Sequence, residues 1–227
     1  MKITYHGHSV IMIELQNGTK LLFDPFIQGN PLTDLEVDEV QADYILVTHG
    51  HNDHIGDLVK IAKNTQATVI SMVEICQWAE NQGVKNTHGM NLGGSFHFPF
   101  GKITFVPALH SSSYTQGRQS LYMGVAAGII LEADGKTIYH AGDTAEFSEM
   151  QLIGENHAID VAFLPIGDNY TMGPSAAARA AKRLQTKMAI PIHYNTFPVI
   201  QQDPQAFVQL IPELGQVMKV GATLELD

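Results

Sequence analysis

Cysteine is almost absent from this sequence, which contains only Cys76 among its 227 residues. A single cysteine excludes an internal disulfide and fits a reducing compartment. Long apolar runs are also missing, because the longest, Leu121–Leu131, is broken by glycine and is too short to span a bilayer. The first residues lack the charged-then-apolar pattern of a secretion signal, so we expect a cytoplasmic protein.

Basic residues are few as well. Lys and Arg number 13 against 23 Asp and Glu, which gives a formal net charge of −10. A surface of this sign repels polyanions, and this argues against nucleic acid and anionic membranes as partners. A small-molecule substrate is the expected partner, and a homo-oligomer stays possible. The length and the ordinary composition, 44% hydrophobic and 16% charged, predict one globular domain over residues 1–227.

The densest group of metal-binding side chains is the run His49-Gly50-His51-Asn52-Asp53-His54, which follows an apolar, strand-like stretch. In extended backbone, residues i and i+2 point the same way, so His49 and His51 can grip one ion. If the chain then turns, Asp53 and His54 face a second ion roughly 3.5–4 Å from the first. The run therefore predicts a metal-binding motif.

Three further candidates share the position of His49, just past the carboxyl end of an apolar strand. They are His110, Asp143 and His193, which follow the predicted strands Ile103–Leu109, Lys136–His140 and Met188–Ile192. A lone histidine is more often structural, but the repeated placement at strand ends favours a shared site. A carboxylate between two cations neutralises charge that both ions share, and this is the role we expect for Asp143.

The predicted elements begin with strands and then interleave strands with helices in both halves of the chain. This order favours two sheets packed face to face with helices outside, an α/β sandwich. Strands are predicted at Lys2–Tyr5, Val10–Leu15, Lys20–Phe23, Tyr44–Thr48, Ala67–Ser71, Ser95–Pro99, Ile103–Leu109, Leu121–Glu132, Lys136–His140, Asp160–Pro165, Met188–Ile192, Gln216–Val220 and Thr223–Leu226. Helices are predicted at Asp57–Asn64, Val73–Gln82, Phe147–Gly154, Pro174–Leu184 and Pro204–Ile211.

The ordered set of metal-ligand candidates resembles the pattern of the metallo-β-lactamase superfamily over nearly the whole chain. Shorter motifs narrow the resemblance to a bacterial and archaeal group of metal-dependent hydrolases related to the L-ascorbate-6-phosphate lactonases. These motifs are Gly7-His8-Ser9, Asp24-Pro25-Phe26, Gly29-Asn30-Pro31, His140-Ala141-Gly142-Asp143-Thr144, Gly167-Asp168-Asn169-Tyr170 and Pro191-Ile192-His193-Tyr194-Asn195-Thr196-Phe197-Pro198.

The resemblance implies a four-layer αββα sandwich, the metallo-β-lactamase fold, with the site at one edge. It also implies two divalent ions. The first would be held by His49, His51 and His110, the second by Asp53, His54 and His193, and Asp143 would bridge them. Histidine-rich ligation suits Zn²⁺, while Mn²⁺, Fe²⁺ and Ni²⁺ stay possible.

Several residues near the cluster have competing interpretations. The resemblance places Asp24 beneath the metals, where it would orient a ligand histidine; otherwise it caps a surface turn. His8 can contact the substrate or an oxyanion, which makes it a catalytic candidate beside Asp53, or it can be structural. The loop Gly167–Gly173 can present backbone N–H groups to an anion. The role of His6 stays open.

The expected activity is hydrolysis by a metal-bound hydroxide, which two ions make available near neutral pH. Asp53 would orient this nucleophile and carry its proton to the leaving group. The net positive charge of the loaded site suits a small, anionic ester, lactone or phosphodiester. Two alternatives stay open, namely a non-catalytic metal-bound module that senses a ligand and a small nuclease or phosphodiesterase.

Overall fold

The side chains of the central strands alternate between two hydrophobic cores. In β11 (Ala127–Ala133), Ile129 and Leu131 belong to one hydrophobic core and Ile130 belongs to another. Successive side chains of a strand point to opposite faces, so a strand that is apolar at every position is buried on both faces. β13 (Val161–Pro165) divides in the same way, with Phe163 in the first core and Leu164 in the second. The sheet that holds these strands therefore lies between two cores.

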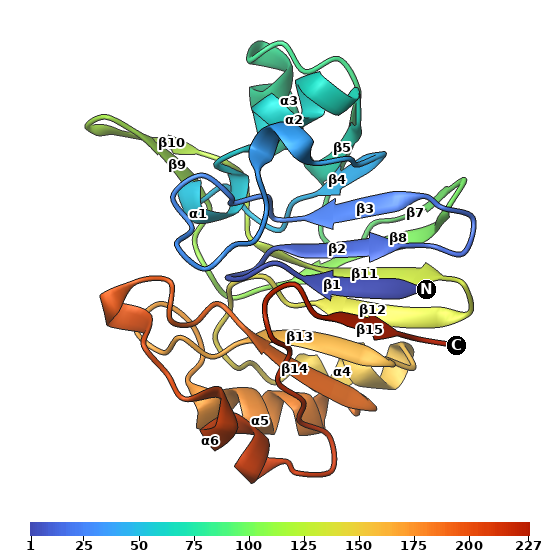
Figure 1. The fold of residues 1–227 in the computed structure, drawn as a ribbon, viewed down its shortest axis with the longest axis vertical. Helices are drawn as coiled ribbons and strands as arrows, with labels where there is room; N and C mark the ends of the chain where they lie inside the picture. Colours follow the sequence, from blue (N-terminus) through green and yellow to red (C-terminus); the bar gives the residue numbers. More distant parts are fainter.

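The computed structural model describes residues 1–227, and its strands form two main sheets between outer layers of helices (Figure 1). The first sheet has the order β15-β1-β2-β3-β4-β5-β6, from β1 (Lys2–Tyr5), β2 (Ile11–Glu14), β3 (Lys20–Phe23), β4 (Tyr44–Leu46), β5 (Thr68–Met72), β6 (Thr87–Met90) and β15 (Thr223–Glu225). The second has the order β14-β13-β12-β11-β8-β7, from β7 (Ser95–Phe98), β8 (Gly101–Pro107), β11, β12 (Lys136–His140), β13 and β14 (Met188–Ile192).

Helices cover the outer faces of both sheets (Figure 1). On the first sheet lie α2 (Leu58–Thr65) and α3 (Val73–Asn81), and on the second lie α4 (Met150–Asn156), α5 (Pro174–Arg183) and α6 (Pro204–Leu210). α5 begins with proline at its first turn, and its buried alanines let it pack closely in the second core. The predicted four-layer αββα sandwich is confirmed. No helix combines the length and apolarity that crossing a membrane requires.

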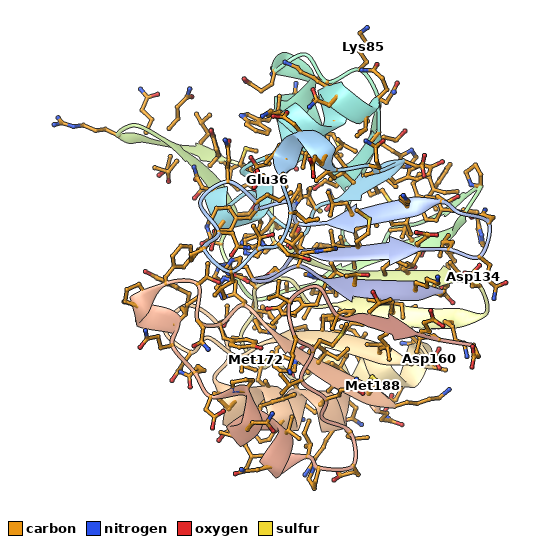
Figure 2. The ribbon with its side chains drawn as sticks, viewed as in Figure 1. Glu36, Lys85, Asp134, Asp160, Met172 and Met188 are labelled. Carbon is orange, nitrogen blue, oxygen red and sulfur yellow. The ribbon has the colours of Figure 1, made fainter.

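Parallel pairing brings the carboxyl ends of the strands that carry the site to one edge. β3, β4 and β5 run parallel, as do β12, β13 and β14. β8 runs in the direction of β12, because both are antiparallel to the β11 strand between them. The opposite edge carries both termini (Figure 1) and the side chains of Asp134 and Asp160 (Figure 2).

Two predicted strands are wrong. Leu121–Glu132 is not one strand, since the chain forms β10 (Gln119–Tyr122) and then leaves regular structure before β11. β10 pairs with β9 (Ser113–Gln116) in a separate hairpin, and β10 is exposed along its whole length. A strand that is exposed at every position leaves no alternation for sequence analysis to detect. Gln216–Val220 forms no strand, and only an isolated bridge joins Ala189 to Gly215 nearby.

Candidate metal centre

The predicted ligands meet at the edge where the parallel strands end. Four of them follow β4, β8, β12 and β14 within a few residues, and two lie in α1 (Asn52–Ile55), a short helix capped by His51. Their donor atoms form overlapping groups whose members lie within 4.8 Å of one another. The residues brought together are His49, His51, Asp53, His54, His110, Asp143 and His193.

The first group consists of three imidazoles. His51 Nδ1 lies 3.0 Å from His49 Nε2 and 3.2 Å from His110 Nε2. The remaining nitrogens of two rings face hydroxyl groups, because His49 Nδ1 lies 3.0 Å from Thr48 Oγ1 and His51 Nε2 lies 3.2 Å from Ser111 Oγ. A ring that donates its N–H to a hydroxyl turns the lone pair of its other nitrogen toward the common centre.

The second group contains Asp53, His54 and His193. Asp53 Oδ2 lies 3.5 Å from His193 Nε2, and all three residues belong to one set of converging donor atoms. The turn of α1 produces this placement, since the His54 N–H bonds to the carbonyl of His51 and redirects the chain. His51 and His54 consequently join different groups, as the motif predicts.

Asp143 lies between the two groups. Its Oδ1 is 3.4 Å from His54 Nε2, and its Oδ2 is 3.0 Å from His193 Nε2 and 3.5 Å from His110 Nε2. The side chain is only 3% exposed, so its carboxylate is taken out of water among imidazoles. This is the position that a bridging ligand needs.

The donor set fits divalent ions. His54 Nε2, His193 Nε2 and Asp143 Oδ1 are buried and have no hydrogen-bond partner. Buried polar atoms in native proteins are almost always satisfied, and atoms left over in this way need an explanation. Imidazole nitrogens and carboxylate oxygens that converge on one space are the ligands that Zn²⁺ takes. Cations in this cluster would satisfy the unpartnered atoms together.

Asp24 is buried beneath the cluster rather than exposed as a turn cap. Its Oδ2 lies 2.8 Å from His54 Nδ1 and accepts a hydrogen bond from Thr48 Oγ1 at 2.7 Å. Its Oδ1 accepts the Thr48 N–H at 2.8 Å. Asp24 therefore contacts His54 directly and reaches His49 through the Thr48 hydroxyl, so one carboxylate orients a ring in each group.

His8 lies behind Asp53 in the same converging set of side chains and is not among the residues that line the cavity, so its role as a substrate contact stays a prediction. Its side chain is 0% exposed, with Nε2 3.2 Å from Asp53 Oδ2 and Nδ1 2.8 Å from Thr196 Oγ1. Both ring nitrogens are thus occupied. Burial and the neighbouring His193 lower the pKa of His8 to about 4, so the ring is neutral at pH 7. A neutral His8 that donates through Nε2 holds Asp53 from behind.

For His193, His54 and Asp53, neighbouring groups of opposite charge shift the pKa values more than burial does. Burial alone would lower the pKa of His193, but the nearby Asp143 carboxylate, and after it that of Asp53, raise it to about 9. Burial also opposes charge on His54, yet Asp143 and Asp24 raise its pKa well above the ordinary value. The pKa of Asp53 is held below its usual range, since the neighbouring His193 and His54 rings outweigh burial.

Metal binding at pH 7 should release protons. The raised pKa values of His54 and His193 favour the imidazolium form in the metal-free chain at this pH, and a ligand imidazole must be deprotonated. Calorimetric titration with Zn²⁺ should therefore give heats that depend on the ionisation enthalpy of the buffer. The proton release should shrink as pH rises through about 9, where His193 loses its proton before metal arrives. Heats at pH 7 that are the same in every buffer would contradict this assignment.

Sequence reasoning missed several supporting residues. The Ser112 hydroxyl accepts the Gly50 N–H at 3.0 Å and donates to the Met123 carbonyl, which fixes the turn between His49 and His51. A Cβ atom on Gly50 would lie 2.3 Å from the Met123 side chain, so this turn admits only glycine. Thr48 was visible as the residue before the motif, but its partners are distant in sequence and gave no signal.

A cavity of about 630 Å³ opens onto the cluster. The residues that line it are Phe26, His51, Asn52, Asp53, His110, Ser111, Asp143, Tyr170, His193, Phe197 and Val199. The loop Gly167–Gly173 contributes Tyr170, while its first residue packs so closely on the His193 carbonyl that a Cβ there would lie 2.5 Å from the oxygen. His6 is absent from the lining, and its Nδ1 lies 2.8 Å from Asp34 Oδ1.

Comparison with known families agrees with this geometry. A profile described as a beta-lactamase superfamily domain matches residues 19–194. A curated protein of Anoxybacillus flavithermus, described as a UPF0173 metal-dependent hydrolase, is 57% identical over 227 residues and is covered completely, as is this chain. A protein of Enterococcus faecalis with the same description is 57% identical over 224 residues, which are 99% of each chain.

A solved structure resembles the chain along its length. Igni18, described as a novel metallo hydrolase from the archaeon Ignicoccus hospitalis, is 38% identical with a TM-score of 0.88. The match covers 100% of this chain and 99% of Igni18. The fold of this chain therefore recurs along its whole length in a protein whose sequence has diverged considerably.

Proposed function

We propose that this chain, which belongs to the UPF0173 metal-dependent hydrolase family of the β-lactamase superfamily, hydrolyses a small ester, lactone or phosphodiester with two divalent ions, most simply Zn²⁺. The observation that carries the proposal is the set of buried, unpartnered donor atoms on His54, His193 and Asp143, which lies beside a cavity of about 630 Å³. A purely structural metal site would be closed, whereas this one adjoins space for a substrate.

The two groups of donors support a division of the ligands between two ions. His49, His51 and His110 would hold one ion, while Asp53, His54 and His193 would hold the other, with Asp143 between them. When bound, such ions lower the pKa of a coordinated water and polarise the scissile carbonyl or phosphoryl oxygen.

Asp53 is the residue we assign to the attacking water. Its carboxylate lines the cavity, and its pKa is held below the usual range, so it stays ionised and accepts a hydrogen bond from the nucleophile. His8 keeps this carboxylate in place from the buried side. Transfer of the water proton to the leaving group is the second role that we assign to Asp53.

Turnover should follow metal content. Elemental analysis of metal-replete protein should find up to two ions per chain, and a panel of small esters, lactones and phosphodiesters should contain hydrolysed members. His110→Ala should lower both the ion count and the rate, because it removes one of three donors from the first group. Structured RNA and duplex DNA should stay intact, since the net charge of −10 repels polyanions.

Three results would overturn this proposal. Full metal loading without turnover of any panel member would favour a module that binds a ligand without reacting. Nuclease activity that survives purification and disappears in His49→Ala would instead place nucleic acid among the substrates. A chain that retains no metal under replete conditions would refute the metal centre itself.

A further inference from the structure

The cavity has two chemically different walls. One consists of the candidate ligands, and the other is formed by Phe26, Tyr170, Phe197 and Val199. These four residues come from the segments that follow β3, β13 and β14, at the same sheet edge as the ligands. An apolar wall beside reactive groups is the usual arrangement of a small-molecule site, in which few polar groups orient the ligand and apolar ones bind its body.

The inner part of this wall is fixed and the outer part is exposed. The Phe26 ring is packed between two neighbours, with centroids 5.5 Å from His8 and 6.2 Å from Phe197. Tyr170 and Val199, by contrast, are 57% and 55% exposed. Exposed apolar side chains scattered singly are ordinary, but a group of them beside a cavity marks a surface that a ligand covers.

The polar residues of the lining outside the ligand set are neutral, and one is already occupied. The Asn52 side chain donates to the Thr115 carbonyl at 3.0 Å and accepts the Thr115 N–H at 2.9 Å, which ties α1 to β9. The Ser111 hydroxyl, which can turn from His51 toward a ligand, and the Tyr170 hydroxyl are left as the uncommitted polar groups. The positive charge of the loaded site would thus be confined to the ions.

We infer, on the basis of the proposed hydrolysis, that the substrate carries an uncharged apolar or aromatic substituent beside its reacting group and no second anionic group. A negative charge is stabilised at the reacting group, where the ions lie. A distant phosphate or carboxylate would find no lysine or arginine side chain in this lining, and Phe26, Phe197 and Val199 offer it no hydrogen bond, which is unfavourable. This inference narrows the class of anionic substrates expected from the sequence. A phosphorylated lactone is excluded, because its phosphate would be a second anionic group beside the apolar wall.

Matched ester pairs test the inference. The first pair is 4-nitrophenyl valerate and 4-nitrophenyl hemiglutarate, which differ at the far end of the acyl chain. The second is phenyl acetate and 4-carboxyphenyl acetate, which differ on the leaving group. In at least one pair kcat/KM of the metal-loaded protein should be about tenfold or more higher for the uncharged member. Equal or higher kcat/KM for the charged member in both pairs would overturn the inference.

Variants of the apolar wall test which residues cause the preference for uncharged esters. Tyr170→Ala and Val199→Ala remove exposed side chains, so the core stays intact, and each should lower the ratio between uncharged and charged members. Leu152→Ala is the matched control, because Leu152 is also 55% exposed but lies on α4 away from the cavity. A ratio that falls equally in the control, or in none of the variants, would contradict the assignment of this wall.

A binding measurement separates the inference from the proposed function. Calorimetric titration of the metal-loaded protein with valerate and with glutarate requires no turnover. Valerate should bind about tenfold or more tightly, and Tyr170→Ala should reduce the difference. If no ester is hydrolysed but valerate is preferred, the proposed hydrolysis fails and the apolar subsite stands. If esters are hydrolysed but glutarate binds as tightly as valerate, the subsite fails and the hydrolysis stands.

Discussion

Replacement of Asp143 by alanine should release both predicted ions and abolish metal-dependent turnover. Its two oxygens lie 3.4 Å from His54 Nε2 and 3.5 Å from His110 Nε2, so the single carboxylate serves both groups. Its removal also leaves buried donors without the charge that balances two cations. The loss of metal affinity should exceed the ~10–100-fold that follows removal of a residue that only supports a ligand. Elemental analysis and rate measurements on the same sample check this.

Asp160→Ala provides the matched control. Asp160 accepts a backbone hydrogen bond from Thr137 at 2.8 Å and lies at the opposite edge of the sandwich (Figure 2). Its loss should leave ion content and rate unchanged. Retention of the full ion content by Asp143→Ala would show that Asp143 is not a ligand.

The stability of the metal-free protein gives a second readout of Asp143. His193 has its pKa raised from 6.5 to about 9 in the folded state, against the effect of burial and chiefly by Asp143. A group whose folded pKa is raised stabilises the fold below its unfolded pKa, and this contribution is lost as pH rises. The free energy of unfolding should therefore fall between pH 6.5 and about 9 in the metal-free wild type. In Asp143→Ala this slope should be much smaller.

Sequence reasoning could place the candidate ligands because a simple rule linked them. His49, His110 and His193 each follow an apolar strand, and strands buried on both faces read as continuous apolar runs. Parallel pairing puts the carboxyl ends of β4 and β14 at one edge, and β8 ends there too because it and β12 are both antiparallel to β11. The convergence of these three histidines follows from the apolar strand pattern of the sequence and from the direction in which each strand runs.

The same rule could not separate ligands from supporting residues. His8 also follows a strand at this edge, yet its Nδ1 faces Thr196, which is 188 residues away in sequence. The role of His8 depends on a neutral ring between Thr196 and Asp53. Contacts between residues so far apart in the sequence leave no local sequence pattern. The apolar wall was missed for a similar reason, since Tyr170 and Val199 acquire their meaning only beside the cavity.

Asp24→Asn should preserve the fold and weaken metal binding by ~10–100-fold. Asparagine has the same shape and tolerates the backbone φ of 43° found at this position. Its amide, however, supplies a donor where Asp24 has two acceptor oxygens. If the amide faces the backbone N–H of Thr48, two donors oppose each other. If it faces His54 Nδ1, the ring must carry its proton on Nε2 and cannot bind metal.

Two further variants give this prediction its specificity. Asp57→Asn is the matched control, because Asp57 is buried and accepts the N–H groups of Ile27 and Gln28 without contacting the cluster. It should lower thermal stability but leave metal affinity unchanged. Thr48→Val removes the hydroxyl between Asp24 and His49, so it should weaken the ion held by His49 more than the other.

Competition with a chromophoric chelator measures the affinity of each variant, and thermal unfolding of the metal-free proteins reports the fold. If Asp24→Asn weakens both ions while Thr48→Val weakens one, a single buried carboxylate orients a histidine in each half of the centre. If Asp24→Asn binds metal as tightly as the wild type, Asp24 only caps the turn after β3. If Asp57→Asn weakens metal binding as much as Asp24→Asn does, the effect arises from general loosening of the loop rather than from ring orientation.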